Sequence, residues 1–194
     1  MGQEYELKYR AEASTLEAIR HAYGPFAAIA METTYYDTPD AALSRRKWTL
    51  RRRLENGSAV CTLKTPMADG SRGEWEVLCP EITQAAPLLT AAGAPSALTD
   101  LISPGVTPVC GARFTRLAKT IPLEGALVEL ALDQGFLLGG GRELAFAEVE
   151  VELKQGPRQD ADRFAAALAR EYGLVPESKS KFKRALSLAH APER

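Results

Sequence analysis

Two short segments far apart in the chain repeat one pattern, with a carboxylate at every second position. The first is Glu4-Tyr-Glu-Leu-Lys8 and the second is Glu148-Val-Glu-Val-Glu-Leu-Lys154. Because successive side chains of a β-strand point to opposite faces, each segment predicts a strand with one apolar and one charged face. A row of carboxylates repels itself unless cations neutralise it, and hard divalent metal ions prefer oxygen ligands. The pattern therefore predicts a sheet whose charged face binds cations.

Further alternating segments extend this sheet. We expect strands at residues 3–10, 28–37, 47–54, 59–65, 73–79, 109–121, 125–133 and 143–154. Asn56-Gly57 marks a hairpin turn between two of them. About eight antiparallel strands in one domain, residues 1–194, predict a β-barrel, because closure removes exposed sheet edges and eight strands enclose room for one small ligand.

Helical spacing appears in four places. We expect helices over residues 12–23 and 160–172, short helices within 82–103, and a short final helix after the basic segment 178–184. Asp160 is predicted to cap the second helix, and Gly173 to stop it. Helices packed outside the barrel complete an α+β fold.

Composition excludes several classes of protein. The 24 Lys and Arg residues balance 25 Asp and Glu, so no net field favours nucleic acid or an anionic membrane as partner. Three scattered cysteines do not match a zinc site or a disulfide framework and fit a reducing cytoplasm. No apolar run approaches the roughly 20 residues that span a bilayer. The alternation itself leaves two arrangements open: the charged face meets bulk water, or it lines a polar lumen.

A polar lumen would support a specific chemistry. Basic side chains match a polyanion; they are Lys8, Arg51, Arg53, Lys64, Arg72, Arg116 and Lys181. The carboxylates Glu4, Glu6, Glu148 and Glu150 would hold Mg²⁺ or Mn²⁺. Both signs of charge in one cavity point to a metal-bound phosphate chain.

A series of motifs in order then identifies a resemblance. They are Glu4-x-Glu6-x-Lys8, Tyr35-Tyr-Asp-Thr38, Leu50-Arg-Arg-Arg53, Thr62-Leu-Lys64, Arg72-Gly-Glu-Trp-Glu76, Phe114-Thr-Arg116, Glu129-Leu-Ala-Leu-Asp133, Glu148-Val-Glu-Val-Glu152 and Ser180-Lys-x-x-Arg184. The chain resembles the CYTH superfamily of triphosphate tunnel metalloenzymes, in its bacterial inorganic triphosphatase branch. Some relatives carry a long C-terminal helical CHAD domain; this chain ends at Arg194 without one, so we expect the CYTH domain alone.

The resemblance implies residue roles. The implied metal ligands are Glu4, Glu6, Glu148 and Glu150, and the implied phosphate ligands are Lys8, Arg51, Arg53, Lys64, Arg116, Lys181 and Arg184. A second ion, or the orientation of the basic residues, is implied for Glu74, Glu76, Glu129, Asp133 and Glu152. The implied reaction is metal-assisted hydrolysis of a terminal phosphate in a small-molecule triphosphate, by a monomer or homodimer. Glu4, Glu6 and Lys8 are the expected catalytic residues. If other cations crowd Lys8 and lower its pKa, it would help deprotonate the attacking water.

Alternation also separates residues that we leave out of the site. Arg52 points outward, Arg113 has the opposite parity to Arg116, and Tyr35-Tyr36-Asp37 is read as packing and turn residues. Few aromatic residues are expected to face the lumen. A bare polyphosphate is therefore ranked first as substrate, a nucleoside or thiamine triphosphate second, cyclisation of ATP third, and a non-catalytic polyphosphate-binding module is the remaining alternative.

Overall fold

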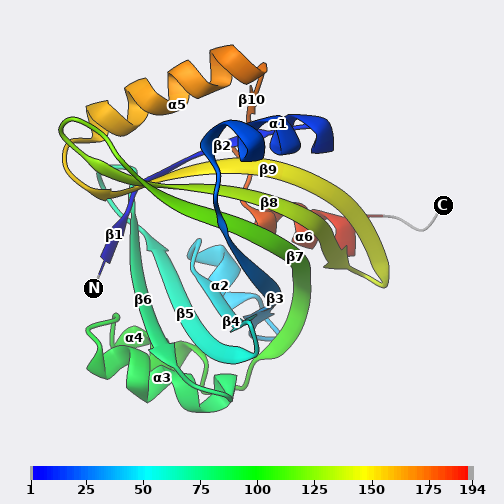
Figure 1. Cartoon of the computed structure of the whole chain (residues 1–194). Coiled ribbons are helices and arrows are strands. Elements are labelled where there is room, and N and C mark those ends of the chain that lie inside the picture. The colour runs from blue at the N-terminus through cyan, green and yellow to red at the C-terminus, as the bar shows by residue number, and fades with distance from the viewer. Residues whose placement is uncertain (1, 192–194) are drawn as a thin grey trace.

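The computed structural model of the chain describes residues 2–191, which form ten strands and six helices (Figure 1). The strands are β1 (Gly2–Glu4), β2 (Glu6–Arg10), β3 (Ala27–Asp37), β4 (Thr49–Glu55), β5 (Ser58–Pro66), β6 (Arg72–Leu78), β7 (Thr107–Pro122), β8 (Leu127–Gly139), β9 (Arg142–Gln155) and β10 (Val175–Pro176). Every predicted strand is present. β8 continues six residues beyond its predicted end, to the turn at Gly139–Gly141.

All strand pairs are antiparallel, in the order β1-β6-β5-β4-β3-β7-β8-β9-β2-β10. The two strands near opposite ends of this order, β1 and β2, are consecutive in the chain and are separated only by Tyr5. β1 pairs with β6, and β2 pairs with β9. Residues 2–10 therefore join both sides of one curled sheet into a barrel, and the junction is the backbone at Tyr5.

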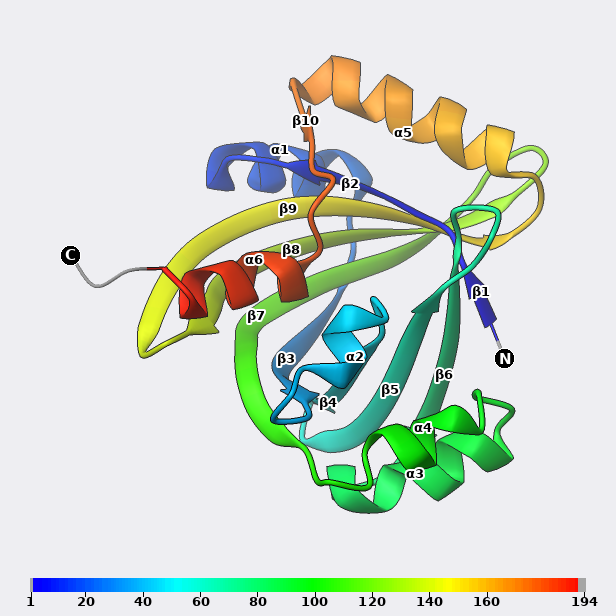
Figure 2. The ribbon, with the colours of Figure 1, turned by 180° about the vertical axis from the view of Figure 1, so that it is seen from behind.

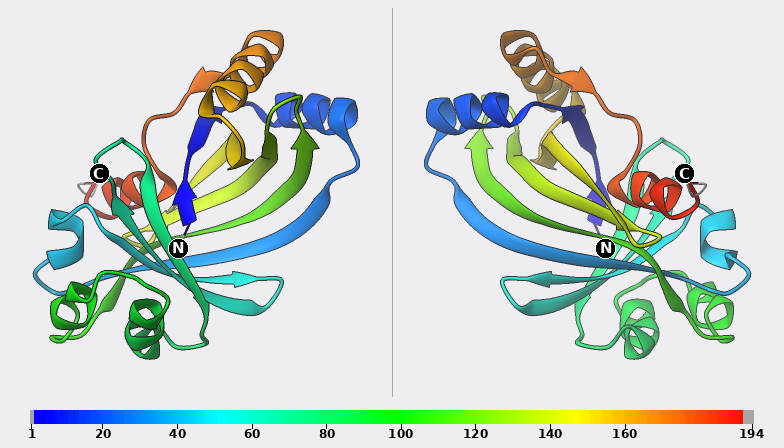
Figure 3. Two further views of the ribbon diagram at one scale, coloured as in Figure 1. Left: turned by 90° about the vertical axis from the view of Figure 1, so that its left-hand side faces the viewer. Right: turned by 90° about the vertical axis from the view of Figure 1, so that its right-hand side faces the viewer.

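Five helices cover the outside of the barrel. They are α1 (Ala13–Tyr23), α2 (Ala42–Arg45), α3 (Ile82–Ala91), α4 (Ala97–Leu101) and α5 (Arg158–Tyr172). α1 and α5 bury Ile19 and Leu168 against the apolar face of β8 and β9, whereas α3 and α4 bury Leu89 and Leu98 against β5 and β6. Figure 3 shows these two helix pairs on opposite sides of the barrel.

The sixth helix, α6 (Lys181–Ala189), differs from the prediction that helices pack outside. Its Ala185 packs with Leu137 and Phe146. By alternation these two side chains share the inner face with Asp133 and Glu148, so α6 fills one end of the bore (Figure 2). The approach is close: a Cβ at Gly139 would lie 2.3 Å from the carbonyl oxygen of Ala185.

Two local predictions need correction. α5 begins at Arg158 after Pro157, so Asp160 lies in the first helical turn and pairs with Arg163 instead of capping the helix. An acidic residue in the first turn still favours the helix through its dipole. Gly173 ends α5 in the left-handed conformation, as predicted. Among residues 2–191 there is no helix that combines the length and apolar character needed to cross a bilayer.

Candidate functional site: a charged tunnel

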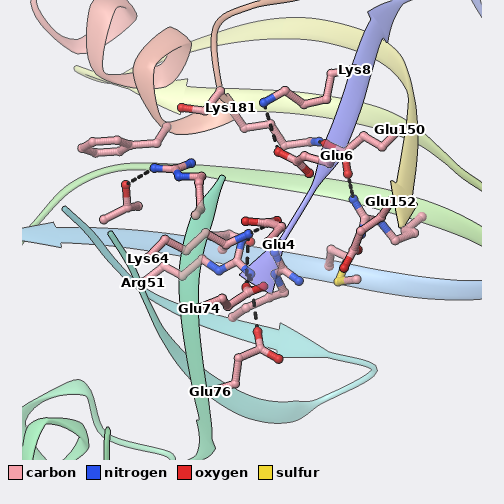
Figure 4. Close-up of a pocket in the computed structure, with 18 of the residues that line it drawn as sticks. Glu4, Glu6, Lys8, Arg51, Lys64, Glu74, Glu76, Glu150, Glu152 and Lys181 are labelled. Carbon is pink, nitrogen blue, oxygen red and sulfur yellow. Dashed lines mark hydrogen bonds and ion pairs between the residues drawn. The ribbon is translucent and has the colours of Figure 1, made fainter. Parts of the chain in front are cut away.

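The charged faces of the strands meet inside the barrel, which settles the question that alternation left open. Glu150 and Arg51, for example, are each only 8% exposed. The tunnel cavity has a volume of about 280 Å³ (Figure 4). Predicted site residues that line it are Glu4, Glu6, Lys8, Arg51, Arg53, Lys64, Arg72, Glu74, Glu76, Arg116, Glu129, Glu150, Glu152 and Lys181. The polar lumen is thus confirmed as a structural feature.

Two arginines of β4, Arg51 and Arg53, and Arg116 of β7 form the cationic part of the tunnel. Burial lowers the pKa of Arg53, and the nearby charges of Arg51 and Arg116 lower it further. Arg53 donates to Glu55 at 3.0 Å, but its buried Nε and that of Arg51 have no hydrogen-bond partner in the described part of the chain. Because buried donors are normally satisfied, this cluster suits an anionic ligand rich in oxygen acceptors.

Lys181 of α6 lies among three carboxylates at the end of the tunnel that α6 fills. Its Nζ lies 2.7 Å from Asp133 and 2.8 Å from Glu150, and it also pairs with Glu148. Burial disfavours the ammonium, but the three carboxylates outweigh that effect and raise the pKa of Lys181. Oxygens of these three acids lie within 4.8 Å of one another, a spacing that would suit a metal ion. In this structure the ammonium of Lys181 already neutralises them.

Asp133 and Glu148 lie on the inner face but behind Lys181, and they also contact other basic side chains. Asp133 accepts both arms of the Arg116 guanidinium, at 2.8 and 2.7 Å, and Glu148 pairs with Arg184. Both carboxylates are fully buried. Asp133, Glu148 and Arg184 are therefore the predicted site residues that do not line the cavity. Asp133 and Glu148 contact the lining side chains of Arg116 and Lys181, and Arg184 contacts Glu148.

The N-terminal strand supplies carboxylates on the other side of the tunnel. Glu4 pairs with Lys64 through one oxygen, but its buried Oε2 has no partner among the described residues. Burial raises the pKa of Glu152, and the charges of Glu4 and Glu129 oppose the lowering effect of Lys154. An unsatisfied carboxylate oxygen beside crowded acids matches the oxygen donor set that Mg²⁺ and Mn²⁺ prefer. The residues present fit a hard divalent cation.

The remaining predicted residues form a mixed wall on β5 and β6. Glu74 lies 3.1 Å from Lys64 and 3.4 Å from Arg51, and it holds both cations toward the lumen. Glu76 is about half exposed at the rim, 3.6 Å from Arg51. Arg72 donates to Thr49 at 3.4 Å. These contacts favour a role in orienting cations over metal ligation.

Sequence reasoning missed two charged residues that line the tunnel. Lys154 lies 2.9 Å from Glu152, and Glu55 accepts from Arg53. Each is two positions beyond a predicted site residue on the same strand, so extending the alternation by one step would have found it. Alternation correctly placed Arg52 and Arg113 outside: Arg52 donates to the carbonyl of Pro80, and Arg113 pairs with Glu143.

The expectation that few aromatic residues face the lumen needs correction. Tyr35, Phe114 and Phe182 all line the cavity. Their exposed area is small because the rings contact one another or a cation: Tyr35 and Phe182 have centroids 5.1 Å apart, and Lys181 lies 5.2 Å from the Phe114 centroid. The other two residues of the motif act as predicted, since Tyr36 packs in the outer core and Asp37 accepts the backbone N–H groups of the 38–44 turn.

A second cavity adjoins the tunnel near the N-terminal strand. This vestibule has a volume of about 580 Å³ and shares Glu4, Glu6 and Lys8 with the tunnel. Its other lining residues include Tyr5, parts of residues 44–49 and 177–180, the β5–β6 loop and α6, and among them are the apolar Met67 and Leu186. The vestibule therefore offers room and apolar surface beside the charged tunnel.

The raised pKa of Glu152 gives a test that needs no substrate. A carboxylate with a raised folded-state pKa stabilises the fold below its unfolded pKa, and this contribution is lost as pH rises through the folded value. In EDTA, Glu152→Gln should therefore gain melting temperature relative to the unmodified chain as pH rises from about 4.5 to 8. A variant that melts lower than the unmodified chain at pH 8 would contradict carboxylate crowding.

Comparison with known proteins identifies a family and a relative with a similar sequence. The CYTH domain family matches residues 2–186. An inorganic triphosphatase from Haemophilus influenzae is 32% identical over 153 residues, which are 78% of this chain but 44% of the relative, so the chain spans less than half of that protein's length.

Several solved structures have a fold similar to that of this chain. HpAC1 from Hippeastrum, a candidate adenylyl cyclase with a dominant triphosphatase activity, is 19% identical with a TM-score of 0.64 and covers 98% of each chain. The PH1819 protein from Pyrococcus horikoshii OT3 is 22% identical with a TM-score of 0.65, over 95% of this chain and 99% of that one. At these identities the likeness establishes the fold.

Proposed function

The chain belongs to the CYTH domain family, and from that premise we propose that it hydrolyses the terminal phosphate of inorganic triphosphate with a divalent metal ion. The observation that carries the proposal is one tunnel cavity in which buried Nε atoms of Arg51 and Arg53 and a buried oxygen of Glu4 have no hydrogen-bond partner among the described residues. The inorganic triphosphatase activity of the Haemophilus influenzae relative supports the choice of reaction.

The phosphate chain is assigned to the cationic cluster and the lysines next to it. Arg51, Arg53 and Arg116 offer planar donor pairs to phosphate oxygens, and Lys64 and Lys181 add point charges. Asp133 and Glu148 are proposed as positioning residues that hold Arg116, Lys181 and Arg184. This keeps the orienting role that the resemblance implied for Asp133 and revises the metal role that it implied for Glu148.

Glu4 and Glu6, with Glu129 and Glu152, are the carboxylates proposed to hold Mg²⁺ or Mn²⁺. When bound, such an ion neutralises phosphate charge and makes a coordinated water more acidic. The protein's own part is to exclude bulk water, align the phosphate chain and neutralise charge on the leaving diphosphate with buried arginines. A cytoplasmic setting is also proposed, because Cys61, Cys79 and Cys110 are free thiols.

Substitution of Lys8 tests whether the N-terminal motif supplies the general base that deprotonates the attacking water. Its Nζ lies 3.2 Å from Glu6, so the contact found for it is a carboxylate and not the crowding cations that a base role invokes. If Lys8 is the base, Lys8→Met should lower kcat by about 10²–10⁴-fold with a small change in KM. Steady-state kinetics at saturating metal ion decides, since a rise in KM with kcat preserved would make Lys8 a phosphate ligand only.

The vestibule favours one alternative substrate class. Its apolar Met67 and Leu186 would suit the organic part of a nucleoside or thiamine triphosphate. Phosphate release from tripolyphosphate, ATP and thiamine triphosphate, each with Mg²⁺ and with Mn²⁺, separates the candidates. Of the three substrates, tripolyphosphate is expected to have the highest kcat/KM. Cyclic AMP and pyrophosphate from ATP would identify a cyclase, and tight binding without turnover in either metal would identify a binding module.

A further inference from the structure

The two leading carboxylates of the proposed metal site belong to different strand pairs. Glu4 is the last residue of the three-residue strand β1, which pairs with β6, and Glu6 is the first residue of β2, which pairs with β9. Tyr5 alone connects them. Short terminal strands fray unless they are tied down, so the spacing of Glu4 and Glu6 depends on what holds Tyr5.

Tyr5 is held by α5 and β9. Its hydroxyl donates to Asp162 Oδ1 at 2.6 Å, and the Arg158 guanidinium lies 4.8 Å from the centroid of its ring. Its carbonyl accepts from the backbone N–H of Leu153 at 2.9 Å. Two of these contacts are made by side chains of α5, which lies close to the strand junction in Figure 1.

The same helix also holds the loop on the other side of the junction. Arg158 lies 2.6 Å from Asp69 in the β5–β6 loop, whose strand β6 is the pairing partner of β1. One arginine thus contacts both Tyr5 and the loop that leads into β6. The contact with Asp69 is partly exposed and is expected to contribute little alone, whereas the Tyr5–Asp162 hydrogen bond involves a charged acceptor.

We propose that Tyr5 is a positioning residue, which with Asp162 and Arg158 of α5 holds the strand junction and so sets the spacing of Glu4 and Glu6 for metal binding. The inference rests on the proposed metal site. Neither Asp162 nor Arg158 lines the tunnel, so they act on it through Tyr5.

The test measures metal binding without substrate. Tyr5→Phe keeps the ring and its stacking with Arg158 but removes the hydroxyl, and Asp162→Asn weakens the same hydrogen bond from the other side. Tyr172→Phe, on the same helix but with its ring packed against the outer core, is the matched control. Free Mn²⁺ is titrated into each protein and followed by its EPR signal, alongside a thermal melt.

Both junction variants should weaken Mn²⁺ affinity about 10–100-fold, the usual effect of losing a residue that orients a metal ligand. The control should bind as the unmodified chain does. High Mn²⁺ should restore kcat in Tyr5→Phe. Unchanged Mn²⁺ affinity in both junction variants, with or without a lower melting temperature, would overturn the inference and leave the proposed function standing. An unmodified chain that binds no Mn²⁺ would overturn the proposed metal site, and this inference with it.

Discussion

Replacing Lys181 by methionine is expected to lower the free energy of unfolding by about 3–5 kcal/mol at pH 8, because three buried carboxylates then share only the two counter-charges of Arg116 and Arg184. Asp133 and Glu148 are fully buried, and Lys181 contacts both. Urea denaturation measures the loss. Methionine keeps the apolar stem that packs near Phe114 and Phe146, so the ammonium is what changes.

The pH dependence of this loss identifies its cause. Without the ammonium, the acids take up protons more readily in the folded state than in the unfolded state. The destabilisation should therefore shrink as pH falls from 8 toward about 4.5, where protonation removes the unpaired charges. Lys179→Met, an exposed position two residues earlier, should change stability by no more than about 0.5 kcal/mol at either pH. A loss for Lys181→Met that stays constant with pH would point to packing instead.

Arg53→Met should reduce kcat/KM for tripolyphosphate by about 10²–10³-fold without destabilising the protein. The pKa of Arg53 is lowered by burial and by Arg51 and Arg116, so its charge is less favourable in the folded protein than in the unfolded chain. Removing that charge should leave the melting temperature unchanged or raise it. The activity falls because a pair of donors for phosphate oxygens is lost.

Arg52→Met is the matched control for this prediction. Arg52 lies next to Arg53 on β4 but points outward and donates to the carbonyl of Pro80. Its variant should keep its activity within about twofold, as expected for a surface substitution. Tripolyphosphate should raise the melting temperature of the Arg52 variant far more than that of the Arg53 variant. If Arg53→Met keeps full activity, the arginine cluster is not the phosphate site.

Strand alternation predicted most of the tunnel because the side-chain period of two assigns a face to each residue. Once β4 and β9 are strands, Arg51 and Arg53, like Glu150 and Glu152, must share a face. Closure explains why that face is internal. The same rule reaches Lys154 and Glu55, which were not assigned to the site from the sequence.

Alternation could not predict which part of the inner face stays open. Glu148 and Glu150 have the same parity, yet Glu148 lies behind Lys181 and Glu150 lines the cavity. What separates them is the path of α6 into the end of the bore, which is a tertiary contact with no periodic signal in the strands. The capping rule also misplaced the start of α5. The helix begins at Arg158, directly after Pro157, and so before Asp160.

A crystal soaked with Mn²⁺ and tripolyphosphate, with anomalous scattering recorded for manganese, tests most directly whether the tunnel binds the metal ion and the phosphate chain. A manganese peak is expected beside Glu4 and Glu6, with the phosphate chain against Arg51, Arg53 and Arg116. A manganese peak among Asp133 and Glu148 with Lys181 displaced, or ligands bound only outside the barrel, would contradict it.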